Sequence, residues 1–309
     1  MRLFSRLAVL LFGLSALLAG CGDKPQPWRE EYPPEAYVAV LSLSPSTTEI
    51  LGTFAPAKLR GRTEACNWPL GIPPGVPVVA GVKPYLERIA ALKPPADMAL
   101  YDASLFRKEE LSKLEQLKIK LYGFSADTID GFVKELSALS AMLGFETQAS
   151  EYVDKIIAAR SAALASAPKP PLKVAIINFG YIAGKNSFYA DVIRAAGGEP
   201  VGPDSNKFEK LNAEALVAMN PQVIVDVNDE AFAEFEKMAT SDSERTKRQQ
   251  KAIINVVRPD LLNDPRFKTI DAIKNRRIAS GRPDIVLRRG SRVDLFIADL
   301  GAYLGAQSN

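Results

Sequence analysis

The amino-acid sequence predicts an α/β protein with two lobes, each built around a central, mostly parallel sheet and joined by a long α-helix. Short β-rich runs alternate with helical patterns in both halves of the chain, which is typical of parallel sheets. The alternation stops over residues 127–165, where apolar residues recur at helical spacing without any proline. We therefore expect an N-terminal lobe over residues 37–126, a bridging helix over residues 127–165 and a C-terminal lobe over residues 172–309. The bridge is either one long helix or two nearly continuous helices interrupted at Gly144.

The N-terminal lobe contains four runs that read as strands. Three helical patterns separate them, and the first begins at Pro45, where Ser44 or Ser46 is suited to cap it. The helix that includes Glu87 is stopped by the sequence Lys93-Pro94-Pro95. In order, the expected elements are a strand over 37–43, a helix from 45, a strand over 76–80, a helix over 85–92, a strand over 96–102, a helix over 105–117 and a strand over 119–124.

The C-terminal lobe repeats this alternation. We expect strands over 173–180 and 222–228 and a short strand within 277–284, with helices over 187–198, 212–220 and 291–305. Residues 232–257 also favour a helix, and the basic run SERTKRQQK within them indicates an exposed excursion.

The composition is that of a globular protein and argues against several functions. Of 309 residues, 47% are hydrophobic and 24% charged, with 39 Lys and Arg against 36 Asp and Glu. This small excess argues against a nucleic-acid partner. The chain contains no histidine, which excludes a histidine-dependent triad and an HExxH metalloprotease. We expect no enzymatic activity, no cofactor and no metal held by the protein itself.

The N-terminus has the layout of an export signal. Two arginines precede an apolar run over residues 7–18, which is too short to cross a bilayer comfortably. The sequence LAGC ending at Cys21 resembles a bacterial lipobox, which implies a signal peptide over residues 1–20 and lipidation of Cys21. The Pro-rich residues 21–36 predict an extended tether. We expect an exported body, anchored to a membrane by lipid, in the periplasm or on the extracellular side.

One sequence pattern occurs in both lobes. LERIAALKPPADMALYD and AEALVAMNPQVIVDVND each contain a glutamate, an apolar helical turn, a proline seven residues later and a strand that ends in acids. Glu87 and Glu214 correspond in this register. Two similar carboxylates on two lobes suit docking onto a two-fold symmetric partner. The alternative is that each glutamate is an ordinary solvated residue.

Seven motifs in order resemble the helical-backbone (class III) substrate-binding proteins of ABC importers, of the cobalamin and ferric-siderophore type. They are LSLSPSTTEIL, GRTEACNWP, YLERIAALKP, AGKNSFYADVIRAAGG, LNAEALVAMNPQVIV, LLNDPRFKTIDAIKNRRI and RRGSRVDLFIADLGAYL. The resemblance implies two lobes with a ligand cleft between them. It also implies that Glu87 and Glu214 dock arginines of a permease dimer, which works with an ATPase.

The same resemblance suggests ligand-binding residues. Trp68 lies in the pocket loop GRTEACNWP, where related cobalamin binders carry a tyrosine at the position of Ala65. Tyr101 lies at the carboxyl end of a predicted strand, where α/β sheets place ligands, and Phe179 and Tyr181 occupy the equivalent place in the second lobe. The other candidates are Phe208, which falls where an aromatic residue lines the cleft, and Asp284, Arg288 and Arg289, which lie at its edge.

The leading hypothesis is capture of a metal chelate, with cobalamin first, a ferric siderophore second and haem third. An enzyme acting on tetrapyrroles or metals and a structural lipoprotein are the alternatives of other classes. Cys66 has no disulfide partner if Cys21 carries lipid, and we expect it to be a small buried residue beside the cleft.

Overall fold

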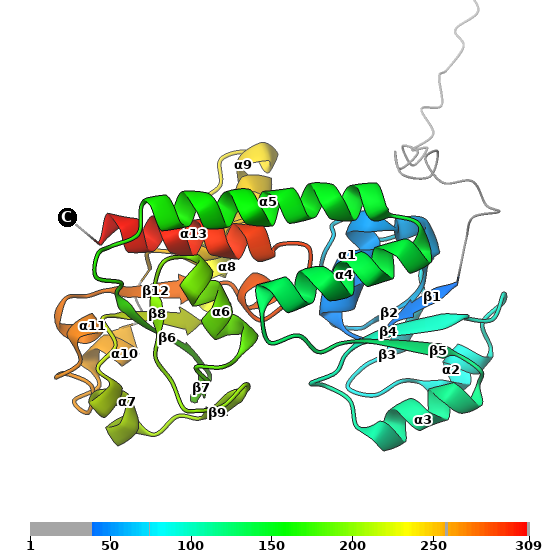
Figure 1. The fold of residues 1–309 in the computed structure, drawn as a ribbon, viewed down its shortest axis with the longest axis horizontal. Helices are drawn as coiled ribbons and strands as arrows, with labels where there is room; N and C mark the ends of the chain where they lie inside the picture. The colour runs from blue at the N-terminus through cyan, green and yellow to red at the C-terminus, as the bar shows by residue number, and fades with distance from the viewer. Residues whose placement is uncertain (1–38, 74, 257–258, 308–309) are drawn as a thin grey trace, which may run out of the picture. The chain divides into compact units, whose positions relative to one another are not determined.

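The structure is a computed structural model that describes residues 39–73, 75–256 and 259–307. The predicted signal peptide (1–20), the tether (21–36) and Cys21 lie outside these residues. The described part contains two sheets with helices packed around them (Figure 1). This arrangement confirms the predicted α/β fold class.

The first sheet is entirely parallel, with strand order β3-β2-β1-β4-β5. Ser44 begins the first helix, because its side-chain oxygen accepts a hydrogen bond from the Thr47 amide at 3.4 Å. The elements of this lobe are β1 (Val40–Ser42), α1 (Pro45–Phe54), β2 (Leu59–Thr63), β3 (Val78–Ala80), α2 (Leu86–Ala90), β4 (Met98–Asp102), α3 (Lys108–Gln116) and β5 (Lys120–Phe124). Of these, β2 was not predicted.

The helical stretch between the lobes consists of two helices, α4 (Ile129–Leu143) and α5 (Glu146–Ala165). They are separated at Gly144, whose φ of 73° is the left-handed conformation that ends a helix and favours glycine. The second helix is the long one, and Figure 1 shows it running alongside α13 (Val293–Ala306) and over both sheets. The bridge is therefore α5, while α4 packs near the first sheet.

The second sheet has strand order β11-β12-β10-β6-β7-β9, and β8 also pairs with β6. Its central pairs are parallel, whereas β11, β7 and β9 add antiparallel edges. Its strands are β6 (Lys173–Asn178), β7 (Tyr181–Ala183), β8 (Glu199–Pro200), β9 (Phe208–Lys210), β10 (Val223–Val227), β11 (Ile253–Ile254) and β12 (Ile278–Gly281).

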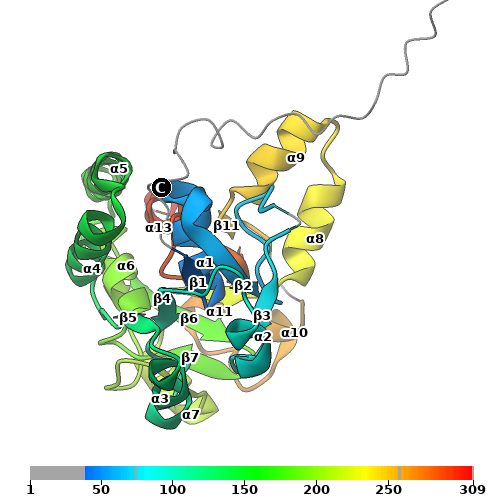
Figure 2. The same cartoon turned by 90° about the vertical axis from the view of Figure 1, so that its right-hand side faces the viewer.

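Short helices connect these strands. A single helical stretch was predicted over residues 232–257. Its described part, residues 232–256, forms the end of α8, then α9 and β11. Figure 2 shows α8 and α9 on the side of the molecule away from α4 and α5. The helices are α6 (Phe188–Ala195), α7 (Ala213–Met219), α8 (Glu230–Lys237), α9 (Asp242–Gln249), α10 (Pro259–Asn263), α11 (Asp271–Lys274) and α12 (Pro283–Val286).

One apolar core joins the two lobes. Ile50 of α1, Leu136 of α4, Ile156 of α5, Phe188 of α6 and Leu300 of α13 are all buried in the same cluster. Smaller clusters cover the other face of each sheet. Because both lobes pack on the same helices, separating them would expose this shared core to water.

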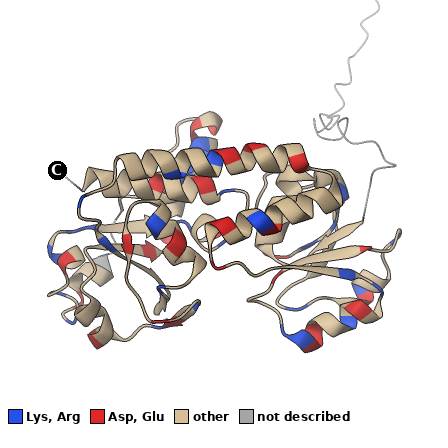
Figure 3. Ribbon diagram, viewed as in Figure 1, with Lys and Arg blue, Asp and Glu red and all other residues tan. Residues whose placement is uncertain are grey.

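Charged residues are interspersed along the helices of both lobes (Figure 3). This mixture differs from the basic stripe typical of nucleic-acid binding. In the described ranges, no helix combines the length and apolar character needed to cross a bilayer.

Candidate functional site

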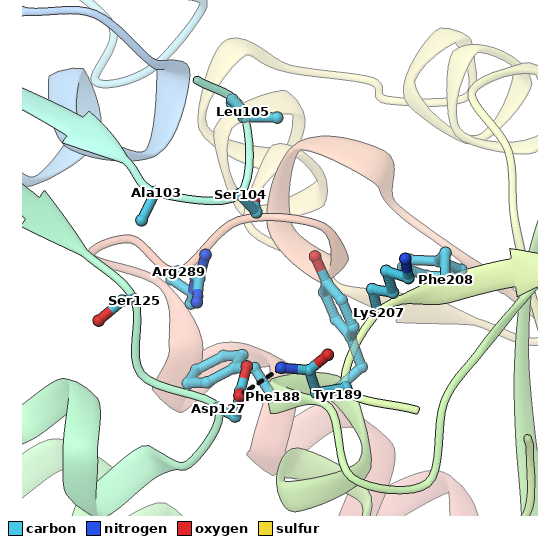
Figure 4. A pocket seen from close by; sticks show the side chains of 11 residues that line it. Ala103, Ser104, Leu105, Ser125, Asp127, Phe188, Tyr189, Lys207, Phe208 and Arg289 are labelled. Atoms are coloured by element: carbon cyan, nitrogen blue, oxygen red, sulfur yellow. Dashed lines mark hydrogen bonds between the residues drawn. The ribbon is translucent and has the colours of Figure 1, made fainter. Parts of the chain in front are cut away.

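A cavity of about 520 Å³ lies between the two lobes (Figure 4). One wall follows the carboxyl ends of β4 and β5, the edge where parallel sheets commonly bind ligands. The opposite wall comes from the start of α6 and from β9. Eleven residues line the cavity: Ala103, Ser104, Leu105, Ser125, Asp127, Phe188, Tyr189, Asn206, Lys207, Phe208 and Arg289.

The turn after β4 shapes the first wall. Asp102 accepts hydrogen bonds from the Ser104 amide at 3.0 Å and from the Ser104 hydroxyl at 2.6 Å. This local pairing fixes the turn and holds Ser104 and Leu105 at the cavity. Leu105 is 58% exposed, so an apolar side chain is available there to contact a ligand.

Aromatic side chains form much of the second wall. The Ser187 hydroxyl accepts from the Ala190 amide and caps α6, which places Phe188 and Tyr189 in the first turn of the helix. The Tyr189 ring lies 4.9 Å from the Phe208 ring, and Figure 4 shows both at the cavity. Burial, reinforced by the charge of Asp102, raises the pKa of Tyr189 to about 12.

A hydrogen bond connects the two walls directly. The Asn206 side-chain amide donates to the Asp127 carboxylate at 2.9 Å, shown as the dashed line in Figure 4. Asp127 follows β5 of the first lobe and Asn206 precedes β9 of the second lobe. This hydrogen bond therefore links the two lobes at one side of the cavity.

A second cavity of about 340 Å³ adjoins the first and shares Ser104, Leu105 and Tyr189 with it. Most of its remaining lining is polar and includes three carboxylates. These other residues are Pro45, Ser46, Asn67, Asp102, Asp229, Pro283, Asp284, Leu287 and Arg288.

Three arginines between α12 and α13 reach into the first lobe. Arg289 pairs with Asp102 and also donates to the Ala126 carbonyl at 2.8 Å. Arg288 donates to the Asn67 side chain at 2.6 Å and lies 3.7 Å from Glu49. Burial lowers the pKa of the Arg288 guanidinium, against the opposing attraction of Glu49.

The third arginine, Arg292, is more deeply buried than the other two. Its guanidinium donates to both Glu49 oxygens, at 2.9 and 2.8 Å, and to Asp284 at 3.1 Å. Burial opposes its charge, but hydrogen bonding and attraction to Glu49 outweigh burial and raise the pKa of Arg292. The guanidinium also lies over the Trp68 ring, 4.6 Å from the ring centre.

Four of the predicted ligand-binding residues lie in the walls of these cavities: Phe208 and Arg289 at the larger one, and Asp284 and Arg288 at the smaller one. The three charged residues among them are also engaged in the contacts between lobes. Their charges are therefore partly neutralised by other protein groups.

The other four predicted ligand-binding residues lie elsewhere. Trp68 packs against Arg292, and Tyr101 packs edge-on against Phe106 with ring centres 5.9 Å apart. Phe179 and Tyr181 belong to the tight β6–β7 hairpin and are 75% and 50% exposed. None of the four lines either cavity.

Glu87 and Glu214 occupy equivalent positions in their lobes. Each is exposed in the first turn of a short helix, α2 for Glu87 and α7 for Glu214. Among the described residues, neither carboxylate has a hydrogen-bond or ion-pair partner. In Figures 1 and 2, both helices lie on the side away from α5.

Cys66 is half-buried in the pocket loop. Its sulfur lies 2.9 Å from the Thr48 hydroxyl and 3.0 Å from the Thr63 hydroxyl. Neighbouring Ala65 is exposed, and its carbonyl faces Arg288 at 3.5 Å. In the described ranges, no group of three or more His, Cys, Asp or Glu residues is arranged to hold a metal ion.

Several site residues were not predicted from the sequence: Glu49, Asp102, Ser104, Asp127, Tyr189 and Arg292. Asp102 and Asp127 had a usable signal, because Asp102 ends one predicted strand and Asp127 follows the end of the next. Arg292 lies in the same arginine-rich segment as the predicted Arg288 and Arg289. Glu49 had no signal, since its pairing with Arg292 depends on contact across 243 positions of sequence.

Comparison with known proteins agrees with this geometry. The profile of a family described as periplasmic binding protein matches residues 40–285. The chain is 28% identical over 159 residues to a cobalamin-binding protein of Halobacterium salinarum, a match covering 48% of this chain and 42% of that protein. It is 24% identical over 164 residues to the high-affinity heme uptake system protein IsdE of Staphylococcus aureus, covering 51% of this chain and 55% of that protein. The chain thus spans about half the length of these relatives.

Among solved structures, the fold resembles the periplasmic vitamin B12 binding protein BtuF of Vibrio cholerae. The TM-score is 0.66 at 19% sequence identity, with 88% of this chain and 100% of that chain covered. The family profile spans both sheets and most of the chain, and it confirms the family resemblance predicted from the sequence. The chain belongs to the periplasmic binding protein family.

Proposed function

We propose that the protein is a lipid-anchored substrate-binding protein that captures a metal chelate, cobalamin first, and delivers it to the permease of an ABC importer. The observation that carries this proposal is the cavity of about 520 Å³ walled by both lobes. Its volume falls in the range of small-molecule sites. Its mixture of aromatic rings and short polar side chains is typical of ligand binding rather than of nucleophilic catalysis.

The charges around the cavity favour cobalamin over a strongly anionic ligand. Arg288 and Arg289 face Glu49 and Asp102, so little positive charge remains for a ligand from these two residues. Lys207, the other cation that lines the cavity, lies 3.9 Å from the carboxylate of Glu209. The donors of Ser104, Ser125 and Asn206 are engaged by protein carboxylates, but their uncharged oxygens remain as hydrogen-bond acceptors for a ligand. Such groups match the amide side chains of a corrinoid better than the carboxylates or catecholates of many siderophores. The similarity to a cobalamin-binding protein of Halobacterium salinarum agrees with this choice.

Haem is the second candidate, with a ferric siderophore as a further alternative of the same class. The phenol of Tyr189 lies in the cavity wall, and a tyrosine oxygen is one of the groups that ligate haem iron in proteins. The similarity to a heme uptake protein also supports this reading. Tyr189→Phe would weaken haem binding strongly but alter cobalamin binding little, which distinguishes the two ligands.

Delivery to a permease is proposed from Glu87 and Glu214. Both carboxylates are exposed, and one lies on each lobe. Charge reversal at either residue should abolish uptake while ligand affinity stays intact. If ligand affinity is lost instead, these glutamates belong to the binding site. Lipidation of Cys21 would hold the body at a membrane surface, near the permease.

The test of ligand identity is calorimetry of residues 22–309 with cyanocobalamin, haem and several ferric siderophores. A specific ligand also raises the melting temperature through mass action. We expect binding of cyanocobalamin, weakened by substitutions at Phe208. If none of these compounds binds, the structural-lipoprotein alternative is favoured.

A further inference from the structure

Two apolar side chains stand out from the surface. Val82 is 91% exposed and Phe179 is 75% exposed, whereas no other large apolar side chain in the described ranges exceeds 59%. Single exposed apolar residues are common. These two differ from the others because each lies beside one of the two helices that carry Glu87 and Glu214.

Val82 projects from the turn between β3 and α2. The Tyr85 amide donates to the Val79 carbonyl at 2.8 Å, and Ala80 bridges to Pro84, so the turn is held against the strand. Val82 is thereby fixed just before the helix that carries Glu87. Residues 84–88 also line a surface hollow of about 370 Å³, which includes Glu87.

Phe179 projects from the turn between β6 and β7. The carbonyl of the next residue, Gly180, accepts a hydrogen bond at 2.8 Å from the amide of Leu211. Leu211 directly precedes Asn212, which caps the helix that carries Glu214. This bond ties the hairpin turn to the start of α7.

The turn itself does not need a phenylalanine. Phe179 and Gly180 have φ values of 44° and 81°, the left-handed pair of a two-residue hairpin turn. Asn-Gly is the sequence that such turns favour, and a bulky residue there adds strain. Phe179 therefore costs local stability while its ring contributes little to the core. A contact outside the protein explains its position better.

We propose that Val82 and Phe179 are apolar anchors that insert into the permease beside the arginines that receive Glu87 and Glu214. This inference rests on the proposed delivery to a permease. Each lobe would then present the same pair of features, one exposed carboxylate and one exposed apolar side chain. Such a repeated pair fits a partner with two-fold symmetry and a cationic site next to an apolar pocket. Tyr181, on the same hairpin and 50% exposed, extends the apolar contact on the second lobe.

A lipid surface is a less suitable partner. The carboxylates of Glu87 and Glu214 lie next to these anchors, and negative charge opposes approach to the anionic lipids of a membrane. A protein surface bearing arginines satisfies the carboxylates and the apolar side chains together.

The test uses substitutions that keep each turn intact. Val82→Thr preserves shape but replaces a methyl group by a hydroxyl, and Phe179→Asn supplies the residue that the turn favours. Binding of the lipid-free body, residues 22–309, to the permease–ATPase complex in nanodiscs would be measured by biolayer interferometry, because acyl chains on Cys21 would insert into the nanodisc by themselves. Ile157→Ser on α5, exposed to 56%, is the matched control away from the proposed surface.

We expect each anchor variant to bind the complex about tenfold more weakly, with unchanged affinity for the ligand and no loss of thermal stability. If both anchor variants bind the complex as tightly as the unaltered protein, while charge reversal of Glu87 and Glu214 abolishes binding, the proposed apolar anchors are wrong. The proposed function would then still stand. If none of the four substitutions alters docking, both proposals fail. If the anchor variants instead lose binding to vesicles of phosphatidylethanolamine and phosphatidylglycerol, the membrane is the partner and the inference is wrong.

Discussion

Arg292 and Glu49 form a bidentate ion pair that joins the lobes, with N–O distances of 2.9 and 2.8 Å. Both side chains are almost completely buried, at 4% and 1% exposure. Because neither charge can reach water, each depends on the other for its stability in the folded protein.

Removal of one partner should therefore destabilise the protein strongly. We expect Glu49→Gln to lower the free energy of unfolding by about 3–5 kcal/mol, because it leaves Arg292 buried without its main counter-charge. Urea unfolding followed by circular dichroism measures this loss. The double variant Glu49→Gln, Arg292→Met should lose less than the sum of the single losses, and simple additivity would contradict the coupling.

The stability of the protein should fall in alkaline solution. Burial raises the pKa of Tyr189 and of Tyr303 to about 12, from an ordinary value near 10. The folded state therefore holds these phenol protons more tightly than the unfolded state does. Their contribution is complete below pH 10 and is lost as the pH rises towards about 12.

Melting temperatures between pH 9 and about 12 would test this dependence. Tyr189→Phe should make the alkaline decline shallower than in the unaltered protein, because one proton-linked contribution is gone. An identical decline in both proteins would mean that Tyr189 ionises equally readily in the folded and unfolded states.

Loss of the Phe208 ring should weaken ligand binding. The ring forms part of the cavity wall beside Tyr189, 4.9 Å away between ring centres. We expect Phe208→Ala to reduce ligand affinity about tenfold, through lost apolar contact. Calorimetric titration provides the measurement. Tyr181→Ser, an exposed aromatic position outside the cavity, is the control and should leave ligand affinity unchanged.

Gly184 controls the loop that forms one edge of the cavity. A Cβ atom there would lie 2.1 Å from the Ser205 carbonyl oxygen and 2.9 Å from that of Lys207. Gly184→Ala should therefore displace residues 205–207, lower the free energy of unfolding by about 1–3 kcal/mol and weaken ligand binding. Gly75→Ala is the control, because its Cβ would meet no atom within 4 Å. Equal stability of the two variants would argue against the predicted collision.

Replacement of Cys66 by serine should leave ligand affinity nearly unchanged. The Cys66 sulfur forms hydrogen bonds with the hydroxyl groups of Thr48 and Thr63, at 2.9 and 3.0 Å. A serine hydroxyl can form the same two hydrogen bonds. Calorimetry with the ligand measures the effect. A large loss of affinity in a variant that still folds would instead assign the thiol to the ligand's metal.

The sequence predicted the fold because its pattern is local. Alternating strand and helix signals and the proline-free stretch identify both lobes and the bridge. The glycine at position 144 already indicated where the bridging stretch divides into two helices. The antiparallel edges of the second sheet were less accessible, since they depend on short segments and on pairing between distant strands. The two-residue strand β11 is an example of an element that exists only through its partner, β12.

The binding residues were predicted less completely, for two physical reasons. The rule that ligands lie at the carboxyl ends of strands assumes a crossover to a helix. After β6 the chain instead turns back into β7, which carries Phe179 to the surface. Tyr101 lies on the face of β4 opposite to Asp102, because successive side chains in a strand alternate.

The three arginines between α12 and α13 have a consequence for ligand choice. Their charges hold Asp102 and Glu49, and these same contacts keep the lobes together. A strongly anionic ligand could form an ion pair with Arg288 or Arg289 only by competing with Glu49 or Asp102 for the same arginine. Binding of a negatively charged ligand would therefore weaken the ion pairs that hold the two lobes together. An uncharged ligand can bind without breaking these ion pairs.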